Sequence, residues 1–327
     1  MSAAAILFLL SFILTSVYRL LALRSGWLDH PNQRSSHTQI TPRGAGLLFG
    51  VLILVLAILE LHERENLRIA LSAGIAVIGV GWWDDIRGLA TRVRFCAYAF
   101  AAIYAVYVLH FAPATSYGFF IIVISALGLL WLINLYNFMD GINGIAGSEA
   151  IFVLIAALWL SGNIANGNAA ALFIWGACAA IGGFLLWNFP IGRVFMGDAG
   201  SAFLGFLLGL LALSSTQWGG PQLTTWFILL GVFIVDTSFT LIVRAISGQR
   251  WYQAHRLHGY QKLNHKLGSH AITVTAVMAV NLGWLLPWAW LVESDHIAAL
   301  TGTLCAYLPL VVACHALKAG RVIEGAR

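Results

Sequence analysis

Acidic, amide and imidazole side chains gather at a few places in this sequence, each beside a long apolar run. Asp84 and Asp85 are adjacent at the end of one such run. Two neighbouring carboxylates repel each other, so they are better tolerated where a cation or an arginine offsets their charge. The pair suits a magnesium ion or a proton-transfer role, and a solvated helix end beside Arg87 explains the pair alone equally well.

A second group, formed by Asn134, Asn137 and Asp140, recurs at every third residue where an apolar run gives way to a glycine-rich turn. A continuing helix would place the three side chains roughly on one face. Amides both donate and accept hydrogen bonds, so this face could bind an oxygen-rich ligand. A turn rich in Asn and Gly explains the same residues without a ligand.

The segment 187–201 joins two further apolar runs and contains Asn188, Arg193, Phe195 and Asp198. We expect a helix to begin near residue 199, so that Asp198 either caps this helix or ligates a metal ion. Capping alone would explain Asp198, but it does not explain the whole set.

The longest polar segment, 244–270, is dense in basic and imidazole groups, among them His255, Arg256 and His258. Such groups fit a site for phosphate if they face acids on the same surface. Contact with anionic lipid headgroups accounts well for the lysines, but less well for the two histidines. Asp236 stands apart inside an apolar run, where a carboxylate is either functional or paired with a buried partner.

The elements that position these residues are apolar helices. The chain of 327 residues is 60% hydrophobic and 9% charged, with a mean hydropathy of +0.85, which excludes an ordinary soluble domain. A spanning helix needs about 20 apolar residues. We therefore predict an all-α, polytopic membrane protein with a single transmembrane domain over residues 1–327. Its eleven predicted spans lie at 2–23, 43–61, 67–83, 95–111, 117–135, 148–161, 169–187, 199–213, 222–243, 271–292 and 296–317.

Basic residues distinguish the two sides of the predicted bundle. Most of them lie in alternate loops, whereas the intervening loops carry only Arg64, with Arg68 beside it. By the positive-inside rule the basic loops are cytoplasmic, so the N-terminus is periplasmic and the C-terminus cytoplasmic. The polar groups described above, except Asp236, lie on this predicted cytoplasmic face. Basic charge spread over short loops also excludes nucleic acid as a partner.

Taken in order, these motifs resemble those of the polyprenyl-phosphate N-acetylhexosamine-1-phosphate transferases, the superfamily that includes MraY and WecA. The resemblance covers almost the whole chain. Its motifs are Asp29-x-Pro-Asn with Arg34 and His37, Asp84-Asp85, Asn137-x-x-Asp140-Gly, the run from Asn188 to Ser201, and His255-Arg-x-His258-x-Tyr-Gln. The last motif is most similar to the WbpL-like branch of glycosyltransferase family 4, which starts O-antigen chains. MraY has three consecutive histidines there, so muramoyl-pentapeptide is a poor fit as substrate.

The resemblance implies transfer of an N-acetylhexosamine-1-phosphate from a UDP-sugar to undecaprenyl phosphate in the bacterial inner membrane, with release of UMP. It also implies Mg²⁺, with Mn²⁺ as a substitute, and allows a homodimer. The reaction brings several negative charges together, so charge neutralisation should supply much of the catalysis. The WbpL-like motif favours a 6-deoxy sugar such as N-acetylfucosamine, with N-acetylglucosamine close behind.

The same resemblance assigns roles to individual residues. Asp198 is the leading magnesium ligand, with Asp85 as the second, and Asp84 and Asp85 serve the lipid phosphate, one of them as a candidate base. Phe195 would stack on uracil. Further substrate contacts are expected from Asn137, Asp140, Asn188, His255, Arg256, His258, Arg34 and His37.

A multi-span transporter is the main alternative from another class, because it shares this composition and topology. Transporters place polar groups near the bilayer midplane, often at broken helices. In this sequence we predict only Asp236 inside a span. A lipid-linked glycosyltransferase that releases UDP is a second rival function, and a scaffold for envelope assembly is a third.

Overall fold

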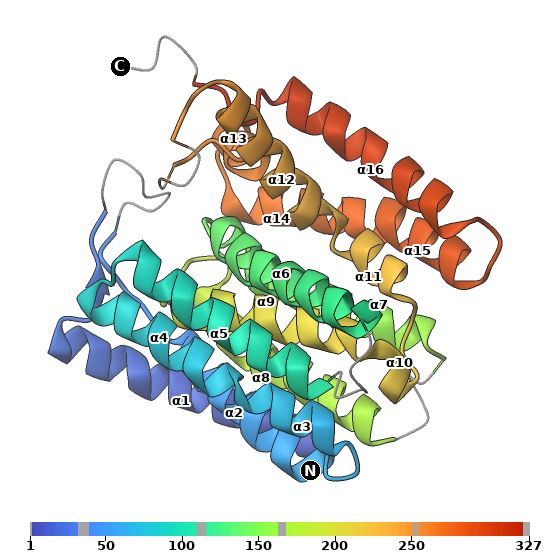
Figure 1. Ribbon diagram of the computed structural model, residues 1–327. Helices are drawn as coiled ribbons and strands as arrows, with labels where there is room; N and C mark the ends of the chain where they lie inside the picture. The colour runs from blue at the N-terminus through green and yellow to red at the C-terminus, as the bar shows by residue number, and fades with distance from the viewer. Residues whose placement is uncertain are drawn as a thin grey trace.

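The computed structural model describes residues 2–31, 39–109, 116–162, 168–250, 253 and 255–322. In this part of the chain helices account for almost all regular structure, joined by one antiparallel two-stranded pairing (Figure 1). The elements are α1 (Ala3–Ser25), β1 (Leu28–Asp29), β2 (Thr41–Pro42), α2 (Gly46–Glu60), α3 (Glu65–Ser72), α4 (Gly74–Arg87), α5 (Thr91–Leu109), α6 (Ser116–Met139), α7 (Ile145–Leu160), α8 (Ala169–Asn188), α9 (Gly197–Leu213), α10 (Ser215–Trp218), α11 (Leu223–Leu229), α12 (Gly231–Ile246), α13 (Gly259–Leu267), α14 (His270–Val280), the π-helix η1 (Asn281–Leu285), α15 (Leu286–Glu293) and α16 (Ala299–Ala316).

The helices confirm the all-α, multi-pass class. Within the described ranges, seven helical segments are long and apolar enough to cross a membrane, and α11 with α12 would add an eighth. This last pair is bent by 74°, so the predicted span at 222–243 is a broken one. The apolar helices α2, α7 and α9 are shorter, with 15, 16 and 17 residues. Each of the eleven predicted ranges thus contains an apolar helix or helix pair, and the number that crosses the membrane stays a prediction.

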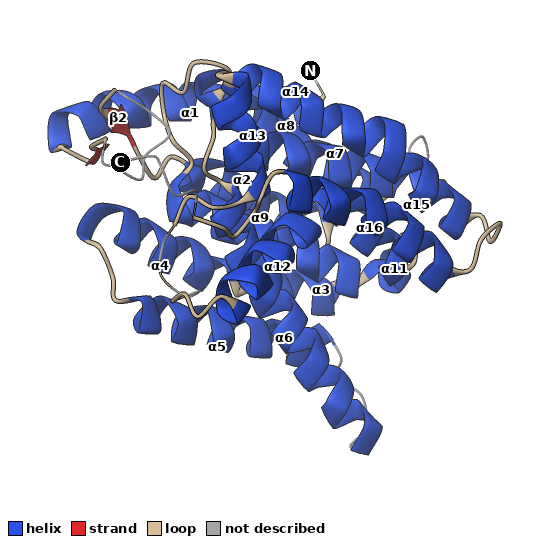
Figure 2. Ribbon diagram, turned by 90° about the horizontal axis from the view of Figure 1, so that it is seen from above, coloured by secondary structure: helices blue, strands red, loops and turns tan. Residues whose placement is uncertain are grey.

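Large apolar side chains cover much of the outer surface, as contact with lipid requires. The amino-terminal part of α6 projects beyond the rest of the bundle (Figure 2), and Phe119 and Ile124 on it are 66% and 68% exposed. Such exposure would be costly in water, where apolar surface is driven inward. The exposed helices therefore agree with a bilayer as the solvent of this protein.

α9 lies at the centre of the bundle. Its residues from Gly197 to Ala212 are all buried, and α2, α4, α6 and α7 pack around it. A Cβ atom at Gly46 of α2 would lie 2.3 Å from the Cα of Gly200, and one at Gly81 of α4 would lie 2.6 Å from the amide nitrogen of Ala199. Glycine at these positions lets the helix backbones approach closely. The carboxyl end of α4 consequently lies against the first turn of α9.

A carboxylate other than Asp236 is buried within a predicted span. Glu149 of α7 is fully buried, and the Asn281 side chain of η1 donates a 2.5 Å hydrogen bond to it. The expectation that Asp236 is the only acid inside a span was therefore wrong. Glu149 lies inside the predicted span at 148–161, and the amide of Asn281, distant in the sequence, is the partner that offsets its burial.

Candidate active site

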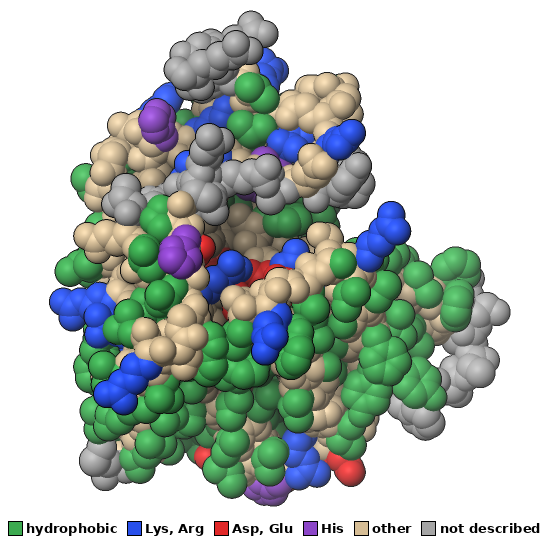
Figure 3. Space-filling model, turned by 90° about the vertical axis from the view of Figure 1, so that its left-hand side faces the viewer, with side chains coloured by type: hydrophobic (Ala, Val, Ile, Leu, Met, Phe, Trp, Pro, Cys, Tyr) green, Lys and Arg blue, Asp and Glu red, His purple; other side chains and the backbone are tan. Residues whose placement is uncertain are grey.

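Acidic side chains meet in a hollow at one end of the helix bundle, with Lys and Arg side chains around them (Figure 3). The elements that form this end are the carboxyl ends of α4 and α6, the first turns of α5 and α9, and the segment before α2. The predicted grouping of polar motifs on one side of the protein is therefore present in the structure.

Asp85 caps the central helix α9. Its Oδ1 accepts the backbone N–H of Asp198 at 2.9 Å, and its Oδ2 accepts that of Ala199 at 3.2 Å. N–H groups in the first turn have no partner within their own helix, and the positive end of the helix dipole favours a carboxylate. Gly197 has φ +74°, and a Cβ there would lie 2.2 Å from Asp85 Oδ2. The helix begins two residues earlier than predicted, and its cap comes from α4.

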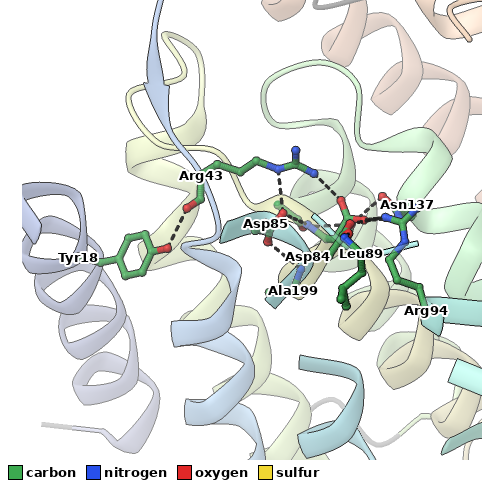
Figure 4. Close-up of polar contacts among 11 residues, drawn as sticks. Tyr18, Arg43, Asp84, Asp85, Leu89, Arg94, Asn137 and Ala199 are labelled. Carbon is green, nitrogen blue, oxygen red and sulfur yellow. Dashed lines mark hydrogen bonds and ion pairs between the residues drawn. The ribbon is translucent and has the colours of Figure 1, made fainter. Parts of the chain in front are cut away.

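Because Asp85 caps the helix, the carboxylate of Asp198 is left for other side chains. Arg43 donates to its Oδ1 at 2.6 Å, and Asn137 donates to its Oδ2 at 3.0 Å. Arg94 contacts Oδ2 as well (Figure 4). The side chain of Asp198 is only 6% exposed, so these partners replace most of its contact with water.

Two arginines connect the three acids. Arg43 Nε lies 2.8 Å from Asp85 Oδ1 while its Nη2 binds Asp198. The Nη1 atom of Arg94 contacts both Asp84 Oδ2 and Asp198 Oδ2. Burial opposes the charge of Arg43, but the carboxylates of Asp198 and Asp85 outweigh it and raise the pKa of Arg43 above its ordinary value. Sequence reasoning considered only Arg87, which lies beside the acidic pair in the sequence, and missed both of these arginines.

The position of Arg43 follows from main-chain hydrogen bonds. The N–H of Phe195 donates to the carbonyl of Pro42 at 2.8 Å, and the N–H of Ala45 donates to the carbonyl of Phe195 at 3.2 Å. The Tyr18 hydroxyl donates to the carbonyl of Arg43 itself at 2.8 Å. The segment before α2 is thereby held against the loop that leads into α9.

Within the Asn134, Asn137 and Asp140 group, only Asn137 reaches Asp198 by a described hydrogen bond. The side chain of Asn134 donates to the carbonyl of Leu130 within its own helix. α6 ends at Met139, so Asp140 lies just beyond it and is partly buried. Loss of hydration, followed by the charge of Asp198, raises the pKa of Asp140 well above its ordinary value.

Asn188 is buried and joins two loops beside the site. Its Oδ1 accepts the N–H of Gly144 at 2.7 Å, and its Nδ2 donates to the carbonyl of Val194 at 2.9 Å. These contacts give Asn188 a structural task, and its predicted contact with substrate stays a prediction. Arg34 and His37 lie outside the described residues.

Comparison with known proteins agrees with this geometry. A family described as "Glycosyl transferase family 4" matches residues 67–216, which include both Asp84 and Asp198. A Bacillus subtilis protein, "Probable undecaprenyl-phosphate N-acetylglucosaminyl 1-phosphate transferase", is 29% identical over 82% of this chain and 78% of its own length. Proteins from Thermotoga maritima and Salmonella typhi, each called "Undecaprenyl-phosphate alpha-N-acetylglucosaminyl 1-phosphate transferase", are 24% and 28% identical. The Thermotoga match covers 80% of both chains, and the Salmonella match covers 77% of this chain and 73% of its own.

The matched family and these relatives support the polyprenyl-phosphate N-acetylhexosamine-1-phosphate transferase superfamily for this chain. The matched range holds the Asp84-Asp85 pair, Asn137 and Asp198, which are the residues that the structure brings together. The recognition of this superfamily from the sequence motifs is thus confirmed.

The histidine segment of the transferase, which contains His255, Arg256 and His258, packs against Asp236. His258 is 2% exposed, and its Nδ1 lies 3.4 Å from Asp236 Oδ1. The rings of His255 and His258 stack at 4.8 Å. Burial, then the nearby charges of His258 and Arg244, lowers the pKa of His255 to about 3. A neutral His255 could offer a diphosphate a hydrogen bond but no positive charge. The predicted binding of diphosphate or sugar by His255, Arg256 and His258 stays a prediction.

The acidic centre of the transferase has a donor set that suits a hard cation. In the described part of the chain no group of three or more His, Cys, Asp or Glu residues is arranged to hold a metal ion. However, one oxygen of Asp84 and one of Asp198 converge on a single positive nitrogen, Arg94 Nη1. Mg²⁺ is commonly bound by one or two carboxylates, with waters and substrate phosphates completing its shell. The two converging carboxylates fit that pattern.

Proposed function

We propose that the protein transfers an N-acetylhexosamine-1-phosphate from a UDP-sugar to undecaprenyl phosphate, releasing UMP and starting a cell-envelope glycan. The observation that carries this proposal is the convergence of Asp84 and Asp198 on the guanidinium of Arg94, with Arg43 beside them. The relatives are named as N-acetylglucosaminyl 1-phosphate transferases that act on undecaprenyl phosphate, which supports the same reaction.

The chemistry of this transfer requires neutralisation of negative charge. A phosphate oxygen of the lipid attacks the sugar-bearing phosphorus of the donor, and the bond to the oxygen of UMP breaks. Arg43 and Arg94 are placed to bind the phosphate oxygens on which charge accumulates. The second pKa of a phosphate monoester lies near 6, as in phosphoserine at about that value. The lipid phosphate is therefore largely ionised at neutral pH, and a general base is not essential.

We propose Asp198 and Asp84 as the residues that hold Mg²⁺, with Mn²⁺ as a substitute. The metal, when bound, would neutralise the diphosphate and orient its oxygens. Asp85 was predicted as the second ligand, but its two oxygens accept the N–H groups of Asp198 and Ala199. We therefore assign Asp85 to holding the first turn of α9, and with it Asp198, in place.

Several finer features belong to the same proposal. We place the enzyme in the bacterial inner membrane with the acidic centre on the cytoplasmic side, because the basic loops lie at that end. The relatives are named for N-acetylglucosamine, which makes UDP-N-acetylglucosamine the first donor to test. The WbpL-like histidine motif makes UDP-N-acetylfucosamine the second, and it also suggests initiation of an O-antigen. A homodimer is compatible with the resemblance.

Two observations favour a transporter instead: the 74° bend between α11 and α12, and the buried Glu149. A product assay separates these functions. The purified protein is incubated with Mg²⁺, undecaprenyl phosphate and each UDP-sugar in turn, and the nucleotide product is identified. UMP together with a diphosphate-linked lipid is the expected result. UDP would indicate an ordinary glycosyltransferase, and the absence of both nucleotides with every donor would refute a transferase role.

A further inference from the structure

Asp236 of α12 binds the beginning of α13. Its Oδ1 accepts the N–H of Gly259 at 2.8 Å, and its Oδ2 accepts the N–H of Tyr260 at 2.7 Å. The Thr240 hydroxyl donates to Oδ1 at 3.2 Å, and His258 Nδ1 lies 3.4 Å from the same atom. Asp236 is only 4% exposed. A buried carboxylate on the free N–H groups of a helix start is a strong attachment between α12 and α13.

Tyr260 continues this connection to α6. Its hydroxyl donates to the carbonyl of Phe138 at 3.0 Å, and the side chain is almost completely buried. Phe138 follows Asn137, whose side chain donates to Asp198 at 3.0 Å. An unbroken series of hydrogen bonds and covalent neighbours therefore runs from Asp236 to Asp198 in the acidic centre.

The contact between Asp236 and the start of α13 also lies beside the rings of the histidine segment. The His258 ring stacks between Phe138, at 6.2 Å, and His255, at 4.8 Å. A Cβ atom at Gly259 would lie 3.1 Å from Asp236 Oδ2, which is closer than an ordinary van der Waals contact, so the start of α13 lies directly against the carboxylate. The ring of His258 and the backbone that follows it thus both contact Asp236.

We infer that Asp236 is a positioning residue for the sugar-phosphate transfer, acting through α13 and Tyr260 on Asn137 and on the histidine segment. This inference rests on the proposed function. Asp236 contacts no reacting group in this arrangement of bonds, so its effect passes through the end of α6. The hydrogen bonds of Asp236 also account for a charged group in an apolar helix, where a carboxylate without partners would be costly.

The test combines hydrogen exchange with transfer kinetics on the purified full-length protein. In Asp236→Ala, amides of residues 257–263 and 136–141 should exchange about tenfold faster, because the bonds that order both segments are lost. The kcat for UMP release should fall by about tenfold, while the KM for undecaprenyl phosphate stays within about threefold. In Tyr260→Phe, only residues 136–141 should exchange faster, because the attachment of α13 to Asp236 remains.

Glu293 of α15 provides a matched control. It accepts the N–H of Gln222 at 3.0 Å and the Thr225 hydroxyl at 2.6 Å, which are contacts of the same kind at the opposite end of the bundle (Figure 1). Glu293→Ala should speed exchange around residue 222 and leave kcat within about twofold of the unmodified protein. A similar fall in kcat in this variant would mean that general destabilisation, not positioning, causes the loss.

Two results would overturn the inference. One is unchanged exchange of residues 136–141 in Asp236→Ala, and the other is faster exchange there with a kcat within about threefold of the unmodified protein. Failure of the proposed function has a different signature, because the unmodified protein would then release no UMP. The exchange measurement does not need the reaction, so it still decides whether Asp236 orders the end of α6.

Discussion

Replacement of Arg94 by glutamine tests whether a metal ion and this guanidinium compete for one position. Arg94 Nη1 contacts Asp84 and Asp198, whose side chains are 11% and 6% exposed, and Arg94 itself is 25% exposed. The partial burial of all three groups limits screening by solvent and salt. Glutamine keeps a hydrogen-bonding side chain but removes the positive charge, so the Oδ2 atoms of Asp84 and Asp198 lose the cation that competes with a metal ion.

The size of the effect follows from the bonds that a metal ion would have to displace. A hydrogen bond to a charged group contributes about 1.5–3 kcal/mol, and about 1.4 kcal/mol corresponds to a factor of ten in affinity. Loss of one such competing bond should lower the Mg²⁺ concentration for half-maximal rate by about tenfold or more. At saturating Mg²⁺, kcat should still fall by about a hundredfold, because one positive group beside the diphosphate is lost.

The assay is UMP release by the purified protein over a Mg²⁺ titration. Arg94→Lys is the control, because it keeps the charge and should leave the Mg²⁺ requirement within about threefold of the unmodified protein. An Arg94→Gln variant that needs as much Mg²⁺ as the unmodified protein, or more, would refute the proposed competition.

Three further predictions address other parts of the site. Asp198→Ala should abolish transfer while the protein remains in the membrane at normal amounts, and near-normal Mg²⁺-dependent activity would exclude Asp198 as a ligand. Asn188→Leu leaves the Gly144 N–H and the Val194 carbonyl unpaired, so it should cost about 2–4 kcal/mol and lower the thermal midpoint in detergent. An unchanged midpoint would contradict the structural role of Asn188. Because the pKa of His255 is about 3 when folded and about 6.5 when unfolded, protonation below pH 6.5 favours the unfolded chain. The midpoint should fall more between pH 7.5 and 5 for the unmodified protein than for His255→Gln, and equal falls would contradict this assignment.

The Asp84-Asp85 pair shows how far sequence reasoning could go at this site. The sequence marks both residues as candidates for catalysis at the end of a helix, and the resemblance makes Asp85 the second magnesium ligand, but it does not decide which of the two is the candidate base. Successive residues on an α-helix point about 100° apart at 3.6 residues per turn. In the structure Asp85 therefore faces the start of α9, whereas Asp84 faces Arg94.

The partners of Asp198 show where sequence reasoning ended. Arg43 and Arg94 come from different parts of the chain, and Asn137 comes from a third. Their meeting depends on how closely α2 and α4 approach α9, which Gly46 and Gly81 permit. No local sequence pattern predicts how closely these helices approach one another.

By itself the sequence determined that the protein is a bundle of apolar helices with its polar motifs at one end, and the order of those motifs identified the superfamily. The helical bundle and its polar end follow from hydropathy and charge, which are local, whereas the superfamily came from the resemblance of the ordered motifs to a known family. Only the tertiary structure decided that Asp85 caps α9, that two arginines neutralise Asp198, and that Asp236 holds α13. Those contacts join residues far apart in the chain, and their geometry is set by the packing of whole helices.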